Sequence, residues 1–410
     1  LTSIVFHKDL PSSINTYAFD KLQTQKTVVK YPKNSSNQAS VLFSDDPVQV
    51  ELLPDDYFWK GESQLFKGEA AGDNAGPCSI SSDGTYMAFG LLGLQKGRAR
   101  VYHQSTTGDS IWTQIGQDIE TTLASSSDPQ FGYSVSISND GQTVGVGARY
   151  GHYPTGVPVG SVEVFTYNSN NSTWELKGSA ITGNNKYSES HTLSLNGTGN
   201  ILVVGESSYD SSDDPGDNDP NTYASDNEGR ARVFEYNNSS SEWDLIGSHI
   251  VGAASSDTMG KSVAINRGAT SISNATVVIG ALKASSYGSA NVYIYDSNSS
   301  DWTLKGEIVH GGQNSNALGL CVSVSSDGSI IALGSPRDSY TSSGNLNYAG
   351  NTRIYKWREF TQSDSDNSTY HYANTSQNDT QTKPLIVTSN SDISSSSGAA
   401  PVVGNSYWTQ

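Results

Sequence analysis

The 410-residue chain is poor in cysteine, histidine and basic residues. Only two cysteines are present, which excludes a disulfide-dense scaffold. Asp and Glu outnumber Lys and Arg by 41 to 24, and the net charge of −17 argues against the clustered positive charge that phosphate binding needs. We therefore expect no nucleic-acid partner. Apolar runs such as 201–204 are too short to cross a bilayer, so we also expect no membrane insertion.

Recognisable catalytic motifs are missing as well. The seven histidines are scattered without metal-ligand spacing, and the chain has no phosphate loop, dinucleotide fingerprint or G-x-S-x-G elbow. We predict that the protein is not an enzyme. A glycosidase-like carboxylate pair, contributed by distant parts of the chain, stays open as an alternative.

What the chain does contain is a five-fold repeat in a background rich in Ser, Thr, Asn, Asp, Tyr and Gly, which favours strands and turns. Asp-Gly and Asn-Gly favour two-residue hairpin turns, because both central residues need a positive φ. The five turns are "SISSDG" (79–84), "SISNDG" (136–141), "SLNGTG" (194–199), a degenerate "AINRGA" (264–269) and "SVSSDG" (323–328).

Each turn is followed by a strand ending in a small residue, and then by a third strand that begins with glycine. Those glycines are Gly97, Gly160, Gly229, Gly288 and Gly350, a period of roughly sixty residues. A fourth strand begins with tryptophan in four of the repeats (112–116, 174–178, 243–247 and 302–306). Four antiparallel strands per period are typical of a propeller blade. We predict an all-β fold, a β-propeller of four-stranded antiparallel blades, with five blades favoured, six or seven still open, and a run of β-sandwich domains as the alternative.

The two ends of the chain lie outside the repeat. We expect an N-terminal extension with short strands over 1–58, the propeller over 59–358, and a Ser/Thr/Asn-rich extension over 359–410. Two roles for the C-terminal extension stay open. It either supplies the missing fourth strand of the fifth blade or docks on a neighbouring copy by strand addition.

The repeat resembles the FG-GAP repeat of integrin α-subunit propellers and related extracellular proteins, over about residues 60–358. The "FG" positions are Phe131-Gly132 and the weaker Ala75-Gly76, Met259-Gly260 and Leu318-Gly319. The "GAP" positions are Gly147-Ala148-Arg149, Gly280-Ala281-Leu282 and Gly334-Ser335-Pro336. The third repeat departs from the pattern with Glu189-Ser190. The resemblance implies an extracellular adhesion or scaffold module.

Members of that family carry D-x-D-x-D-G calcium loops, which are reduced here to turns with at most one carboxylate. One carboxylate cannot supply the six to eight oxygens that Ca²⁺ prefers, so we expect no metal in these turns and no other cofactor. An acidic insertion at 209–229 differs. It places Asp217, Asp219, Asn221 and Glu228 at positions 1, 3, 5 and 12 of a calcium loop, and a Ca²⁺-bound loop stays open there beside a solvated acidic loop.

The two cysteines precede the first and the fifth turn, at adjacent positions of equivalent strands. In a closed five-bladed ring, Cys78 and Cys321 would lie on neighbouring blades. We predict a disulfide that clasps the ring and contributes about 5 kcal/mol in the chain-entropy model. Two unrelated buried thiols are the alternative.

Eleven N-x-S/T sequons indicate an N-linked glycoprotein and therefore an extracellular location, secreted or at the cell surface. They lie at Asn34, Asn170, Asn171, Asn196, Asn237, Asn238, Asn274, Asn298, Asn367, Asn374 and Asn378. Asn171, Asn238 and Asn298 lie at the equivalent hairpin tip of three repeats, which predicts a belt of glycans on the ring. The chain begins at Leu1 without a visible signal peptide, so we expect a mature form or a fragment.

The function that these features favour is structural. We expect a secreted glycosylated scaffold whose propellers assemble with copies of themselves, head to tail through their terminal segments, into an extracellular fibre or surface layer. A monomeric adhesive or lectin-like propeller is the alternative.

Overall fold

The computed structural model contains two compact units, Leu1–Phe66 and Lys67–Gln410. The described residues are 3–5, 28–32, 49–53, 66–68, 72–93, 96–105, 111–123, 129–152, 159–183, 191–210, 227–282, 288–306, 309–310, 317–336, 350–359 and 406–409.

The first unit contains one parallel three-stranded sheet, in the order β1-β2-β3. Its strands are β1 (Ser3–Val5), β2 (Val28–Pro32) and β3 (Gln49–Leu53). All three strands lie within residues 1–58.

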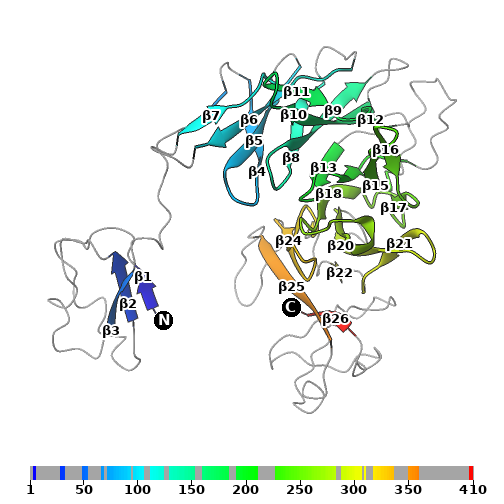
Figure 1. The fold of residues 1–410 in the computed structure, drawn as a ribbon. Coiled ribbons are helices and arrows are strands. Elements are labelled where there is room, and N and C mark those ends of the chain that lie inside the picture. Colours follow the sequence, from blue (N-terminus) through cyan, green and yellow to red (C-terminus); the bar gives the residue numbers. More distant parts are fainter. Residues whose placement is uncertain are drawn as a thin grey trace. The chain divides into compact units, whose positions relative to one another are not determined.

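The second unit is a β-propeller of five four-stranded antiparallel blades, which follow one another in chain order (Figure 1). Blade one contains β4 (Ala75–Ile80), β5 (Tyr86–Leu91), β6 (Arg98–Gln104) and β7 (Trp112–Gln114). Blade two contains β8 (Phe131–Ile137), β9 (Thr143–His152), β10 (Val159–Asn168) and β11 (Thr173–Leu176). Blade three contains β13 (His191–Leu195), β14 (Ile201–Glu206), β15 (Arg230–Asn237) and β16 (Glu242–Leu245). Blade four contains β18 (Met259–Ile265), β19 (Thr276–Ala281), β20 (Ser289–Asp296) and β21 (Asp301–Leu304). Blade five contains β23 (Cys321–Val324), β24 (Ile330–Ser335), β25 (Asn351–Glu359) and β26 (Ser406–Thr409).

Short additional elements complete this unit. Blades two, three and four each add a two-residue strand beside the third strand, namely β12 (Ile181–Thr182), β17 (Ile250–Val251) and β22 (Val309–His310). The helix η5 (Ile272–Asn274) is a single 3-10 turn. The predicted all-β propeller of five blades is therefore confirmed.

The fourth strand of blade five comes from the C-terminal extension, far along the chain from β25. Trp408 of β26 lies opposite Trp357 of β25. The same register position is taken by tryptophan in blades two, three and four, where Trp174, Trp243 and Trp302 lie opposite tyrosines. The C-terminal extension thus takes the first of the two roles considered from the sequence, and the second unit runs on beyond residue 358.

The hydrophobic core of the propeller is divided among the four boundaries between successive blades. Each core cluster joins side chains of two neighbouring blades, as where Val162 and Val164 of β10 meet Leu193 and Leu195 of β13. Tryptophans of the fourth strands extend these clusters and donate a hydrogen bond to the preceding blade. The indole Nε1 of Trp243, for example, lies 2.7 Å from the carbonyl oxygen of Lys177. A blade is therefore held mainly by its neighbours.

Glycines allow the backbones of neighbouring blades to approach closely. A Cβ atom at Gly90 of β5 would overlap the backbone of Gly132 in β8. Gly205 meets Gly260 in the same way, and the pairing recurs at the boundary between blades four and five. Any other residue at these positions would separate the two sheets.

The hairpin turns also pack against the preceding blade. Gly141 has φ +70°, and a Cβ there would overlap the ring of Tyr86 in blade one. Gly84 occupies the equivalent turn of blade one with φ +73°, but its Cβ would meet no atom within 4 Å. The two glycines therefore share a backbone conformation and differ only in whether a blade lies beside them.

This difference gives a matched pair of substitutions. We expect Gly84→Ala to lower the free energy of unfolding by about 1 kcal/mol, the cost of a positive φ with a Cβ. Gly141→Ala should cost about 2–4 kcal/mol, because overpacking against Tyr86 is added. Urea unfolding monitored by circular dichroism measures both. Equal losses for the two variants would contradict the packing of this turn on blade one.

The aspartate of each Ser-x-Asp-Gly turn is held by its own turn. The Ser81 hydroxyl donates to Asp83 at 2.6 Å, and the backbone N–H of Thr85 donates to the same carboxylate. Hydrogen bonds from the serine hydroxyls and the backbone lower the pKa of Asp83 and of Asp327 to about 2. The carboxylates are therefore structural groups of the turns.

A lowered pKa means that these turns stabilise the fold while their aspartates are ionised. The contribution is complete above the ordinary pKa of 3.8 and is lost as the pH falls towards 2. We expect Ser325→Ala to raise the pKa of Asp327 from about 2 towards 3.8, with Asp83 unchanged as an internal control. An NMR titration of the carboxyl carbons measures both values, and an unchanged Asp327 would refute the role of the serine.

Candidate interaction surface

The five blades are built alike, but the first and the last differ from the others in burial. Ser79 of β4 lies opposite Ala88, which belongs to the core cluster shared with blade two. Successive residues of a strand point to opposite faces, so Ile80 lies on the face of blade one that points away from blade two. Its equivalents in blades two, three and four are Ile137, Leu195 and Ile265, exposed by 0%, 1% and 2%. Ile80 is 52% exposed. We call this surface of blade one the leading face.

On blade five, the exposed face is the one that in blades one to four is covered by the next blade. Ile354 is the fifth residue of the glycine-initiated third strand, and the equivalent valines of blades one to four, Val101, Val164, Val233 and Val292, are at most 1% exposed because the next blade covers them. Ile354 is 59% exposed, and Ile330 on the same face is 39% exposed. We call this surface of blade five the trailing face.

The glycines that begin the third strands of blades four and five agree with this assignment. Gly288 at the start of the third strand of blade four would overlap Leu318 of blade five if it carried a Cβ. For Gly350, its equivalent on blade five, the three atoms nearest to such a Cβ all belong to Pro336 of the same blade. The leading and trailing faces are thus built as blade boundaries, yet they do not cover each other.

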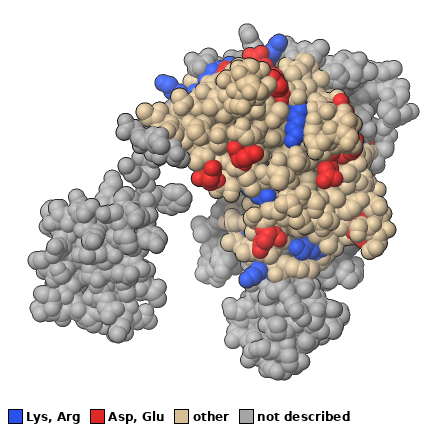
Figure 2. All heavy atoms as spheres, in the orientation of Figure 1, with Lys and Arg blue, Asp and Glu red and all other residues tan. Residues whose placement is uncertain are grey.

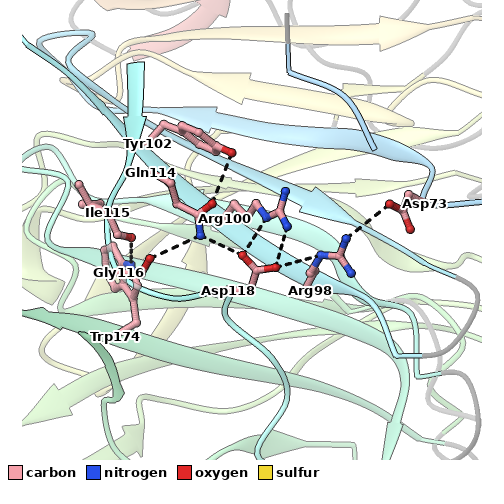
Figure 3. Close-up of polar contacts among 9 residues, drawn as sticks. All are labelled: Asp73, Arg98, Arg100, Tyr102, Gln114, Ile115, Gly116, Asp118 and Trp174. Atoms are coloured by element: carbon pink, nitrogen blue, oxygen red, sulfur yellow. Dashed lines mark hydrogen bonds and ion pairs between the residues drawn. The ribbon is translucent and has the colours of Figure 1, made fainter. Parts of the chain in front are cut away.

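Figure 3 shows a polar cluster of blade one. It belongs to the leading face, because Arg100 lies opposite Phe89 and Phe89 lies opposite Cys78, on the face that carries Ile80. Arg100 donates two hydrogen bonds of 2.8 Å to the carboxylate of Asp118. The side-chain amide of Gln114 donates to Asp118 at 2.9 Å. Arg98 lies 3.2 Å from Asp118 and 3.5 Å from Asp73. Two positive and two negative charges therefore balance within blade one.

The pKa of Asp118 reflects this arrangement. Partial burial raises its pKa, but the hydrogen bonds from Arg100 and Gln114 and the nearby positive charges outweigh that effect and hold it below the ordinary value. Asp118 is therefore ionised at neutral pH and keeps the Arg100 guanidinium paired.

Blade three carries the same Gly-Arg-Ala-Arg sequence in a buried setting. There, Arg230 and Arg232 are paired with Glu206, and Arg230 and Glu206 are fully buried. Arg232, the equivalent of Arg100, also donates to the carbonyl oxygen of Thr182 in blade two. The position of Arg100 is thus one that contacts a preceding blade elsewhere in the array.

The predicted disulfide is not formed in the structure. Cys78 lies on the leading face and Cys321 on the trailing face, and both are exposed free thiols. The prediction placed the two cysteines correctly on the first strands of blades one and five. It failed because it assumed that blades one and five cover each other, whereas Ile80 and Ile354 show that they do not.

Most sequons of the described residues are at least partly exposed. Asn170, Asn171, Asn238, Asn274 and Asn298 are exposed, and Asn237 is partly buried. The tips between third and fourth strands carry most of them, as expected. Asn34, Asn367, Asn374 and Asn378 lie outside the described residues.

Asn196 is a correction to the predicted glycosylation sites. It is 0% exposed, and its amide nitrogen donates to the carbonyl oxygen of Ala269 at 3.0 Å. Its side-chain oxygen accepts hydrogen bonds from the backbone of Asn200 and Ile201. A glycan on this nitrogen would have to displace the turn of blade three from blade four.

The predicted calcium loop is mostly outside the described residues, which include Glu228 but not Asp217, Asp219 or Asn221. Within the described ranges, no three His, Cys, Asp or Glu side chains converge in a metal-binding arrangement. The calcium loop therefore stays a prediction.

On the face shown in Figure 2, acidic and basic side chains are interspersed among uncharged ones. None of the described segments forms a helix with the length and hydropathy that crossing a membrane requires.

Comparisons with known proteins assign no family to the chain. No family model matches the chain, and no curated protein is significantly similar to it. Solved structures with a similar arrangement include hydrazine synthase of Kuenenia stuttgartiensis, with 13% identity and a TM-score of 0.42 over 68% of this chain and 70% of that one. A periplasmic gluconolactonase of Pseudomonas aeruginosa has 13% identity and a TM-score of 0.40, over 62% and 63% of the two chains. A candidate 6-phosphogluconolactonase of Bacteroides uniformis has 10% identity and a TM-score of 0.43, over 68% and 66%.

These neighbours correct the prediction that the chain is not an enzyme. Their names include enzymes, so membership of this fold does not exclude catalysis. The missing sequence motifs are a weak argument, because propeller sites can be assembled from residues of several blades. At these identities and TM-scores, the similarities assign no reaction to the chain.

No sequence motif marks Ile80, Ile354 or the cluster around Asp118 as a surface. The available signal was the repeat itself. Aligning the five units shows which positions face a neighbour, and the first and last units then each have one face without a neighbour inside the array. Only the burial of those positions shows that the two faces stay apart.

Ile80 and Ile137 provide a direct test of the leading face. Ile80→Asp should change the free energy of unfolding by no more than about 0.5 kcal/mol, as expected for an exposed site. Ile137→Asp should lower it by more than about 3 kcal/mol, because it buries a carboxylate without a partner. Urea unfolding of the dilute protein measures both. A large loss for Ile80→Asp would mean that the leading face is covered within the single chain.

Proposed function

We propose that this chain is a secreted, glycosylated structural protein whose propellers assemble head to tail into an extracellular fibre or surface layer. The observation that carries the proposal is the pair of exposed end faces, one at each end of the array. A leading face and a trailing face on one molecule can join successive copies without closing, and such a heterologous contact builds a filament.

The extracellular part of the proposal rests on the exposed sequons and on the resemblance to FG-GAP repeats. Asn171, Asn238 and Asn298 are exposed at equivalent hairpin tips, where glycans would not disturb the boundaries between blades. Four glycines of that repeat, Gly132, Gly260, Gly280 and Gly319, permit close approach of neighbouring blades. Both features support an extracellular scaffold module.

Assembly is tested on the whole protein without partners. We expect sedimentation velocity to show species that grow with protein concentration, and electron microscopy to show linear arrays with one propeller per repeat. A single species with the mass of one chain at every concentration would overturn the proposal. It would favour the monomeric adhesive or lectin-like alternative, which glycan-array binding then tests.

A further inference from the structure

We propose that the trailing face of blade five in one copy packs on the leading face of blade one in the next copy, so that the contact between copies repeats the boundary between two blades. This inference rests on the proposed function and specifies the surfaces that carry it. The occupant of each end face is therefore a second copy of this chain.

The apolar residues of the two faces match those of an internal boundary. At the boundary between blades two and three, Val164 of one face packs with Leu195 of the other. Ile354 is the equivalent of Val164, and Ile80 is the equivalent of Leu195. Joining the trailing and leading faces would cover Ile354 with Ile80, and each is more than half exposed in the single chain.

The hydrogen-bonding positions are matched as well. At internal boundaries, a hydroxyl on the first strand donates to the carbonyl of a glycine at the start of the next blade. Thr192 donates to Gly260 at 2.9 Å, and Ser262 donates to Gly319 at 2.7 Å. Cys321 takes the position of these hydroxyl residues on blade five, since it lies opposite a second-strand glycine as they do.

The cysteines follow from the same equivalence. In blade one, the glycine equivalent to Gly260 is Gly76, two residues before Cys78 on β4. A contact built like an internal boundary therefore brings Cys321 of one copy close to Cys78 of the next. Both thiols are exposed in the single chain. They are the only two cysteines in the sequence, so thiol cross-linking can report the contact without introduced cysteines.

The polar cluster is compatible with both the free and the joined state. Arg98, Arg100, Asp73 and Asp118 are paired with one another within blade one. Their side chains stay partly exposed, by 24% for Arg98 and 31% for Asp118. The leading face can therefore lie in water without unpaired charge and can be covered without a charged partner.

Two single-cysteine variants test the contact. Cys78→Ser and Cys321→Ser proteins are mixed at assembling concentrations and treated with a short bismaleimide, and the products are separated under denaturing conditions. The mixture should give a cross-linked dimer and nothing larger, because each chain carries one thiol. Either variant alone should give at least tenfold less dimer. The unsubstituted protein should give a ladder of cross-linked oligomers.

A substitution on the trailing face provides the second test. Ile354→Asp, made in the Cys78→Ser protein, should lower the dimer yield at least tenfold because it places a carboxylate in the contact. Leu304→Asp is the matched control, since Leu304 is 44% exposed on β21 and lies outside both end faces. Thermal unfolding of both variants confirms that the fold is retained.

The outcomes separate this inference from the proposed function. Assembly seen by sedimentation and microscopy, without dimer in the mixture of variants, would overturn the pairing of these faces and leave the proposed function standing. A cross-linked monomer with no ladder would show that the two faces close within one chain, which also overturns it. Absence of any assembly would overturn both.

Discussion

The close approach of backbones between successive blades is the constraint on which the rest of the propeller depends. Gly90 and Gly205 lie so near the next blade that a single added carbon would overlap its main chain. This spacing lets the valines of the third strands reach the next sheet and lets the tryptophans of the fourth strands reach the previous one. The core is consequently a series of boundaries, and an array of five blades leaves one boundary-type face at each end.

Local signals explain how far the sequence could predict this fold. Asp-Gly turns, glycine-initiated third strands and tryptophan-initiated fourth strands are all encoded within a few residues, so four complete blades could be predicted from their spacing. The fourth strand of blade five could be given only as one of two roles for the C-terminal extension, because a long segment separates β26 from β25. A signal did exist, since Trp408-Thr409-Gln410 repeats the residues Trp112-Thr113-Gln114 of blade one.

The exposure of the two end faces could not be predicted from the sequence, for a different reason. Ile80 and Ile354 have the same character as the buried residues at equivalent positions, so their sequence contains no mark of exposure. Burial at a blade boundary depends on the sheet that lies opposite, which is a long-range property. The same limit affected Cys78 and Cys321, whose strands were identified correctly while the assumed closure between them was not. Repeat position predicts which way a side chain points, but not whether anything covers it.

The free energy gained by covering the two end faces can be compared with the free-energy cost of association. Covering the exposed half of Ile80 and of Ile354 would contribute roughly 2 kcal/mol together, from the usual value for burying such side chains. Association costs at least about 4 kcal/mol in lost translational and rotational freedom, so these two residues alone cannot hold copies together. The remaining contribution would have to come from the repeated backbone contacts along the whole boundary. Such a contact is weak for one pair and depends on concentration, whereas the same boundary within a chain is stable because the chain already holds the blades together.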